Sequence, residues 1–147
     1  MSSESTAESR PIARVFRYTK PDFEGAKRLI KLARTDHLIG IMQVLKSGGE
    51  VNLHSHHHAD GFWMVISGSI RFYGDKGEPL GDFGPMEGLV VPRDAQYAFE
   101  NVSGADAELL QLEAFDMAIR DDASLLADKI DYEKPKQPMQ GFTDLAS

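Results

Sequence analysis

Short strand-like segments, separated by turn residues at close intervals, constrain the fold of this chain more than any other feature of its sequence. Stretches with the apolar spacing of a helix are few. Turns are indicated by Gly-Gly at 48–49, Asp-Lys-Gly at 75–77 and Pro-Arg-Asp at 92–94, whose residues supply the backbone angles that turns need. Many short strands with such turn signals predict an all-β fold, either a sandwich or a barrel.

The predicted strands follow one another from the N-terminal third of the chain to Asp116. Glycine-containing turns separate most of them, and one pair is hinged at Ser67-Gly68. They are expected at 13–18, 26–34, 37–46 and 51–56, as two strands within 62–74, as one short strand within 75–88, as two strands within 89–101, and at 107–116.

The pattern changes after Asp116. Residues 123–130 have the apolar spacing of a short helix, and the segment that follows is polar and contains proline. We therefore expect three parts: a disordered N-terminal arm over 1–12, a β-barrel over 13–116, and a C-terminal helix and tail over 117–147 packed on the barrel.

Composition narrows the class of protein. A length of 147 residues suits one domain with a single core. The net charge of −7 argues against nucleic acid and anionic membranes as partners, and neither a membrane-length apolar run nor a secretory signal is seen. The chain has no cysteine, which fits a cytoplasmic protein and leaves His, carboxylate, Tyr or water as metal ligands.

The segment LHSHHHADGFW, residues 53–63, holds four of the five histidines. Alternate residues of a strand share a face, so His54 and His56 would lie about 6.6 Å apart along it and could bind one ion, while His57 would point the opposite way. A ligand four residues from the first lies roughly 13 Å away, so His58 and Asp60 reach the same ion only if the chain bends. The alternative is a polar loop with solvated histidines.

This segment and VPRDAQYAFEN resemble the two motifs of the cupins, which are small β-barrels of the jelly-roll type. The cupin motifs are G(X)5HXH(X)3-4E(X)6G and G(X)5PXG(X)2H(X)3N, and the resemblance covers roughly residues 39 to 115. It implies a single-domain cupin jelly-roll β-barrel that holds a divalent metal ion. The matching residues are Gly48, His54, His56 and Gly68 in the first motif, and Pro92 and Asn101 in the second.

The departures from the motifs leave the metal shell open. Gly61 stands where the family has its glutamate, and Tyr97 stands where it has its last histidine; Asp94 replaces the motif glycine. Asp60 fills the gap at the shorter spacing, or His58 does so from the loop, or the site has decayed and the barrel binds an organic ligand. Imidazole and carboxylate ligands suit zinc, iron, nickel or manganese alike.

Further polar and aromatic residues are candidates for the same site. Tyr97 would point into the barrel, where it is either a weak ligand and general acid or base beside the metal, or a buried aromatic residue. Trp63 would form a wall of the ligand site or an ordinary core residue. Gln43 and Glu113 interrupt apolar strands; facing inward, Glu113 would add a ligand or a base, and otherwise it faces solvent.

The function expected from the resemblance is a metal-dependent enzyme acting on a small molecule: an isomerase, cyclase, lyase or dioxygenase. The alternative is a non-catalytic cupin with a degenerate metal site that binds or senses a small ligand. A purely structural protein would leave the histidines without a role. Single-domain cupins commonly pair, and a strand at 13–18 offers an edge to a neighbouring sheet, so we expect a homodimer.

Overall fold

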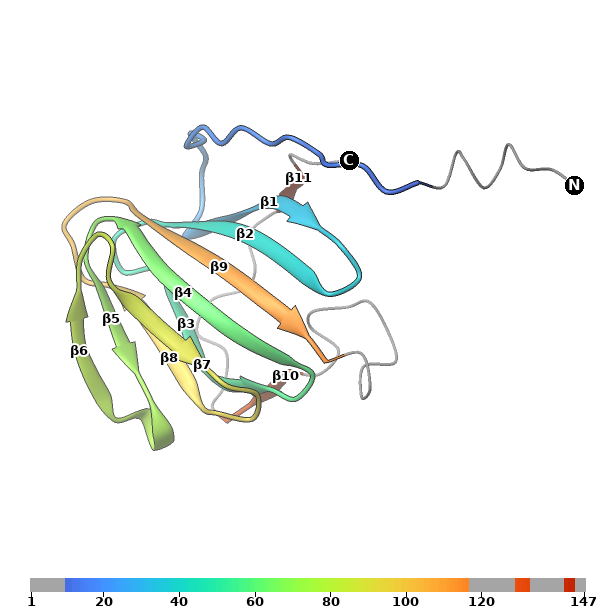
Figure 1. The fold of residues 1–147 in the computed structure, drawn as a ribbon. Coiled ribbons are helices and arrows are strands. Elements are labelled where there is room, and N and C mark those ends of the chain that lie inside the picture. The colour runs from blue at the N-terminus through green and yellow to red at the C-terminus, as the bar shows by residue number, and fades with distance from the viewer. Residues whose placement is uncertain (1–9, 117–128, 133–141, 145–147) are drawn as a thin grey trace, which may run out of the picture.

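A computed structural model describes residues 10–116, 129–132 and 142–144 of the chain. Figure 1 shows two layers of strands that face each other. The elements in chain order are β1 (Lys27–Arg34), β2 (Leu38–Leu45), β3 (Glu50–His56), β4 (Ala59–Ser67), β5 (Ile70–Tyr73), the single-turn helix η1 (Asp75–Gly77), β6 (Pro79–Phe83), β7 (Gly88–Val91), β8 (Tyr97–Asn101), β9 (Ala107–Phe115), β10 (Lys129–Asp131) and β11 (Phe142–Asp144).

One sheet has six strands in the order β11-β1-β2-β9-β4-β7, and we call it sheet A; the other, sheet B, has five strands in the order β10-β3-β8-β5-β6. Among the described pairings, only β1 with β11 is parallel. The predicted all-β jelly roll is confirmed. Over the described residues, however, the sheets form an open sandwich rather than a closed barrel.

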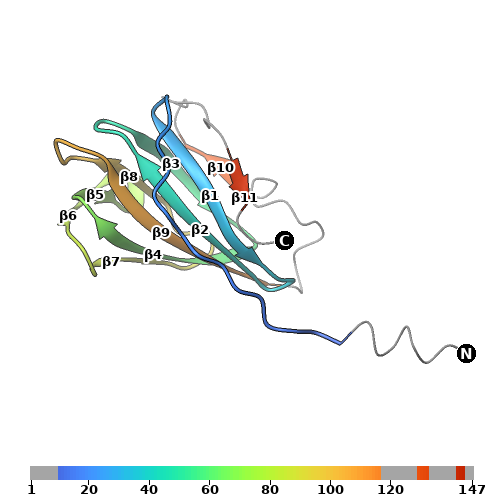
Figure 2. The same cartoon turned by 90° about the horizontal axis from the view of Figure 1, so that it is seen from above.

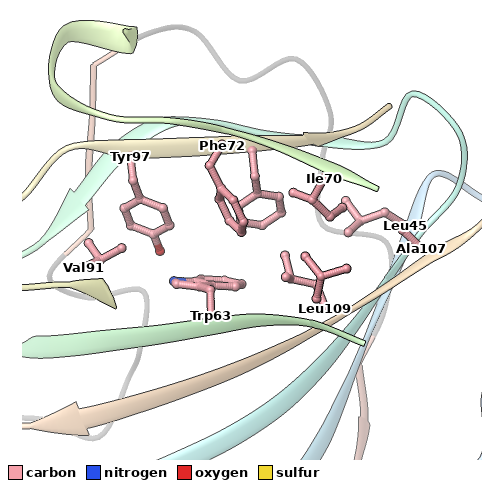
Figure 3. Packing of buried hydrophobic residues seen from close by; sticks show 10 residues of the cluster. Leu45, Trp63, Ile70, Phe72, Val91, Tyr97, Ala107 and Leu109 are labelled. Atoms are coloured by element: carbon pink, nitrogen blue, oxygen red, sulfur yellow. The ribbon is translucent and has the colours of Figure 1, made fainter. Parts of the chain in front are cut away.

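The core lies between the two sheets because alternate residues of each strand point into it. In β4, the residues Ala59, Gly61, Trp63 and Val65 are buried. Figure 3 shows aromatic side chains from sheet B facing Trp63 of sheet A. Burial of each large apolar side chain stabilises the fold by about 1.5–3 kcal/mol, so this alternation fixes which residues line the interior.

The strands predicted between residues 26 and 116 are confirmed, but the one at 13–18 is wrong. Residues 10–23 pair with no described strand and instead run along the outer side of β1 and β2 (Figure 2). Tyr18 and Phe23 pack there against a buried cluster that includes Met42 and Val44, and the Tyr18 hydroxyl donates to Glu108 at 2.6 Å. Side-chain packing, not a strand ladder, therefore holds this segment.

The C-terminal segment contributes strands that the sequence did not predict. Of the helix expected over 123–130, residues 129 and 130 belong instead to β10, which pairs with β3, and residues 123–128 lie outside the described residues. β11 pairs with β1. Of the arm expected over 1–12, residues 1–9 also lie outside them. Within the part of the chain described, no helix is long and apolar enough to cross a membrane.

Candidate functional site

Strand β3 presents two histidines to the interior. His54 and His56 are 3% and 7% exposed, and their ring centroids lie 5.0 Å apart. His57 follows the end of the strand, is exposed, and its Nδ1 lies 2.8 Å from a carboxylate oxygen of Asp94. The two-residue period of the strand thus separates an inner pair from an outer histidine, as the sequence predicts.

A backbone carbonyl fixes the orientation of the His54 ring. The Nδ1 atom of His54 lies 2.6 Å from the carbonyl oxygen of Asn52, so the neutral ring carries its proton on Nδ1 and donates it there. Burial lowers the pKa of His54 to about 3, against the smaller opposing effect of this hydrogen bond. The ring is therefore uncharged at neutral pH, and its Nε2 lone pair remains for a ligand.

Strand β8 places Tyr97 beside the histidine pair. Tyr97 lies directly opposite His54 in the antiparallel pairing of β3 with β8, and the two ring centroids are 4.4 Å apart. Its side chain is 2% exposed. In Figure 3 its hydroxyl points into the space between the sheets, toward the side where Trp63 lies, and the two rings are 5.6 Å apart. Tyr97 is thus a core aromatic residue and a neighbour of the histidines at once.

The turn before β8 explains how Tyr97 is positioned. Asp94, at the place of the motif glycine, has a φ of +69°, a backbone conformation that favours glycine. Its N–H donates to the carbonyl oxygen of His56 at 2.7 Å, which ties this turn to the end of β3. The backbone geometry expected for a glycine is therefore kept, although the residue has changed.

Sheet A contributes a row of buried polar side chains. Glu113 in β9 is 1% exposed and accepts a hydrogen bond from Gln111 Nε2 at 2.9 Å. Gln111 Oε1 in turn accepts from Gln43 Nε2 at 3.0 Å, which links β9 to β2. Glu113 therefore faces inward, and the solvent-facing alternative is wrong.

Gly61 leaves space that its neighbours use. It lies opposite Glu113 in the pairing of β4 with β9. A Cβ atom at Gly61 would lie 3.2 and 3.3 Å from the two carboxylate oxygens of Glu113, and 3.3 Å from Trp63 Nε1. Trp63 Nε1 and Gln43 Oε1 are buried and have no hydrogen-bond partner among the described residues. A donor and an acceptor therefore remain in the interior for a bound molecule or water.

The structure does not bring the two other predicted metal ligands to the histidine pair. Asp60 is exposed, and its Oδ1 accepts the backbone N–H of Arg93 at 2.8 Å. His58 is half-buried, and its ring lies 5.2 Å from that of His57. Within the described residues, no three His, Asp or Glu side chains gather closely enough to hold a metal ion. Of the four predicted ligands, all of which lie in the described part of the chain, His54 and His56 are the two whose rings lie side by side.

Two features of the site were missed from the sequence. The carbonyl of Asn52 is a backbone group, so no side-chain pattern could reveal it. The proximity of Glu113 to Gly61 depends on strand register between distant segments. The only signal was a carboxylate at a position that alternates with apolar residues in a strand.

The chain matches no protein-family model and no curated protein. Its fold is similar to several solved structures. KdgF from Halomonas sp. shares 18% identity with a TM-score of 0.63 over 71% of this chain and 96% of its own. An uncharacterized protein with a double-stranded β-helix domain from Klebsiella pneumoniae shares 17% identity with a TM-score of 0.65 over 84% and 100%. The Schizosaccharomyces pombe Cnp3 cupin domain shares 14% identity with a TM-score of 0.60 over 67% and 71%.

Proposed function

Since this chain has the cupin fold, we propose that it binds a divalent metal ion through His54 and His56 and acts on a small molecule between the two sheets. The observation that carries the proposal is the buried histidine pair on one face of β3. When bound, such an ion polarises an oxygen atom of the substrate or of water. Imidazole ligands can bind zinc, iron, nickel or manganese.

The donor groups suit a metal in their protonation and orientation. A ligating histidine must be neutral, and it usually donates its other ring N–H to a carbonyl or carboxylate. His54 has both properties, through its lowered pKa and its contact with Asn52. Two imidazoles alone leave several positions of the shell for other ligands, which an enzyme needs for substrate or water.

Tyr97 is the side chain we assign to proton transfer. Its hydroxyl lies among buried groups between the sheets, next to the histidine pair, where a proton can pass to or from a bound molecule without exchange with bulk water. The unpaired donor of Trp63 and acceptor of Gln43 would orient a ligand that carries hydroxyl or carbonyl oxygens. Isomerisation, cyclisation, elimination and dioxygenation of such a molecule are all reactions of this kind.

Metal analysis of protein purified without a histidine tag tests the proposal. We expect near-stoichiometric metal in the wild type and its loss in His54→Ala. His57→Ala is the matched control, because that ring is exposed and faces Asp94; its metal content should equal that of the wild type. Equal trace amounts in the wild type and in His54→Ala would show that the pair binds no metal.

A second candidate function is small-ligand binding without metal or turnover. The absence of a three-ligand cluster among the described residues favours it. Tyr97→Phe separates the two once small oxygenated compounds have been screened for binding and conversion. The enzyme hypothesis predicts that the variant keeps its metal and loses conversion; retained conversion would remove Tyr97 from the proton-transfer role.

A further inference from the structure

We propose that the ammonium groups of Lys27 in β1 and Lys129 in β10 bind a carboxylate group of the small molecule on which this protein acts. The inference rests on the proposed function and deepens it, because it names the chemical class of the ligand. Neither lysine belongs to the metal site proposed above, so the two proposals can fail separately.

Lys27 is a deeply buried cation. It is only 7% exposed and lies directly opposite Leu45, a fully buried core residue, so its side chain is on the inner face of sheet A. Lysine side chains are almost never buried to this degree unless they are paired. Among the described residues, however, none forms a salt bridge or a side-chain hydrogen bond with Lys27. An anion from outside the chain would offset the cost of burying this charge.

Lys129 brings a second ammonium group to the same interior from the facing sheet. It is half-buried and lies directly opposite His56 in the pairing of β10 with β3. Residues directly opposite each other share a face of the sheet, so Lys129 is on the side of the histidine pair. Burial lowers the pKa of Lys27 to about 8 and that of His54 to about 3, and the charge of Lys129 adds to both effects. The two ammonium groups are therefore close enough for their charges to interact, and one anion would relieve their repulsion.

Asp131 limits the charge of this site. It lies opposite His54, and its Oδ1 atom is 3.3 Å from Lys129 Nζ. Since the His54 ring is neutral, the two lysines and Asp131 together leave one positive charge. A carboxylate carries one negative charge, whereas a phosphate ester carries roughly 1.5 to 2 at pH 7. The charge balance therefore favours a carboxylate over a phosphate.

Gln43 indicates a hydroxyl group on the same ligand. It pairs with Leu29, so it lies diagonally across from Lys27 on the inner face of sheet A, at a distance of about 7–8 Å. Its Oε1 atom is buried and has no hydrogen-bond partner among the described residues. A ligand hydroxyl could donate to this oxygen while the carboxylate accepts from Lys27 Nζ. The ligand class that satisfies both groups is a small hydroxycarboxylic acid, bound as its anion.

NMR titration of the full chain with glycolate, a minimal hydroxycarboxylate, and with glycolamide, its uncharged amide, tests the inference. The wild type should bind glycolate at least about tenfold more tightly than glycolamide. Lys27→Met, which removes the buried charge at similar side-chain length, should lower the affinity for glycolate about 10–100-fold. Asp131→Asn should raise this affinity, because it removes a competing carboxylate. Lys76→Met, at an exposed lysine of η1, changes the net charge equally and should bind glycolate as the wild type does.

Equal affinity of the wild type for glycolate and glycolamide would overturn the inference, as would equal losses of affinity in Lys27→Met and Lys76→Met. Tighter binding of inorganic phosphate than of glycolate would overturn the carboxylate class. If circular dichroism shows that Lys27→Met does not fold, Asp131→Asn decides: a raised affinity for glycolate supports the inference, and an unchanged one contradicts it.

The same titrations, repeated after removal of metal by a chelator, separate this inference from the proposed function. A wild type that holds metal but does not distinguish glycolate from glycolamide would overturn the carboxylate subsite alone. A wild type that holds no metal, yet binds glycolate in a way that Lys27→Met weakens, would support the subsite and overturn the metal site. Binding of neither would overturn both.

Discussion

At the scale of single residues, Lys27 is a lysine whose positive charge is clearly disfavoured by its surroundings. It begins β1, on the same face as the buried Leu29, and is only 7% exposed. Burial, together with the positive charge of Lys129, lowers the pKa of Lys27 to about 8. Between pH 8 and the ordinary lysine pKa of about 10.4, the unfolded chain binds more protons than the folded one, so the free energy of unfolding rises with pH.

We therefore predict that Lys27→Met reduces the rise of the free energy of unfolding with pH. Below pH 8 the folded protein bears the full cost of the buried ammonium group, so the variant should be more stable than wild type at pH 7, by about 1–3 kcal/mol. Urea unfolding at pH 7, 9 and 10.5 measures both effects. Lys31→Met, on the same strand and only half-buried, is the control. A variant with the pH dependence of the wild type would contradict the prediction.

The direction of individual side chains was predictable where a strand period could be counted. The inner pair His54 and His56 and the outer His57 follow from the alternation of β3 alone. For Glu113 the alternation of β9 did not distinguish an inward-facing from a solvent-facing side chain, because leucines lie on both faces of this strand. Its burial depends on the amide of Gln111 and on the space left by Gly61, and such partners from other strands are not visible in a linear sequence.

At the scale of elements, the connection between β4 and β5 depends on Gly68. Its φ of +88° favours glycine, and a Cβ there would lie 2.7 Å from the Cβ of Ala107. Gly77 has a similar φ of +79°, but a Cβ would meet nothing within 4 Å. A side chain would therefore be strained at both positions, whereas only at position 68 would its Cβ also clash with a neighbour.

Alanine substitutions at these glycines should separate the two effects. Gly77→Ala should lower the free energy of unfolding by about 1–2 kcal/mol, the cost of a side chain in the left-handed region. Gly68→Ala should cost a further 1–3 kcal/mol or so, because the clash with Ala107 forces the strands apart. Chemical denaturation of both variants gives the difference. Equal losses of unfolding free energy in the two variants would mean that β9 moves to accommodate the new methyl group at position 68 at no energetic cost.

The elements themselves were predictable where turn residues bound an apolar run, which holds from β1 to β9. Residues 13–18 have the composition of a strand but pair with no described strand; Tyr18 is instead held by packing and by Glu108. β10 was predicted as part of a helix, because apolar spacing over a few residues does not reveal that the edge of β3 is available to pair with this segment. Edge strands depend on such long-range pairing more than on local pattern.

At the scale of the whole molecule, the outer face of sheet A carries an apolar row across three strands. Phe62 in β4 lies opposite Val90 of β7 on one side and Leu112 of β9 on the other. Phe62 and Val90 are 43% and 68% exposed, and Leu112 is half-buried. A contiguous group of exposed apolar side chains on one face of a sheet is a candidate interaction surface.

We predict that this row forms the interface of a homodimer, in place of the strand edge expected at 13–18. A twofold contact buries the same residues of both copies, and an aromatic residue at its centre would contribute most of the binding energy.

Light scattering during gel filtration should give twice the 16.3 kDa chain mass for the wild type. Phe62→Glu should give the monomer mass, because it places two carboxylates in the apolar contact. Leu80→Glu, at a similarly exposed leucine on edge strand β6 of sheet B, is the control and should remain dimeric. A monomeric wild type would refute the dimer, whereas a dimeric Phe62→Glu would move its interface to another face, of which the exposed Ile12 and Val15 beside sheet A are the first to test.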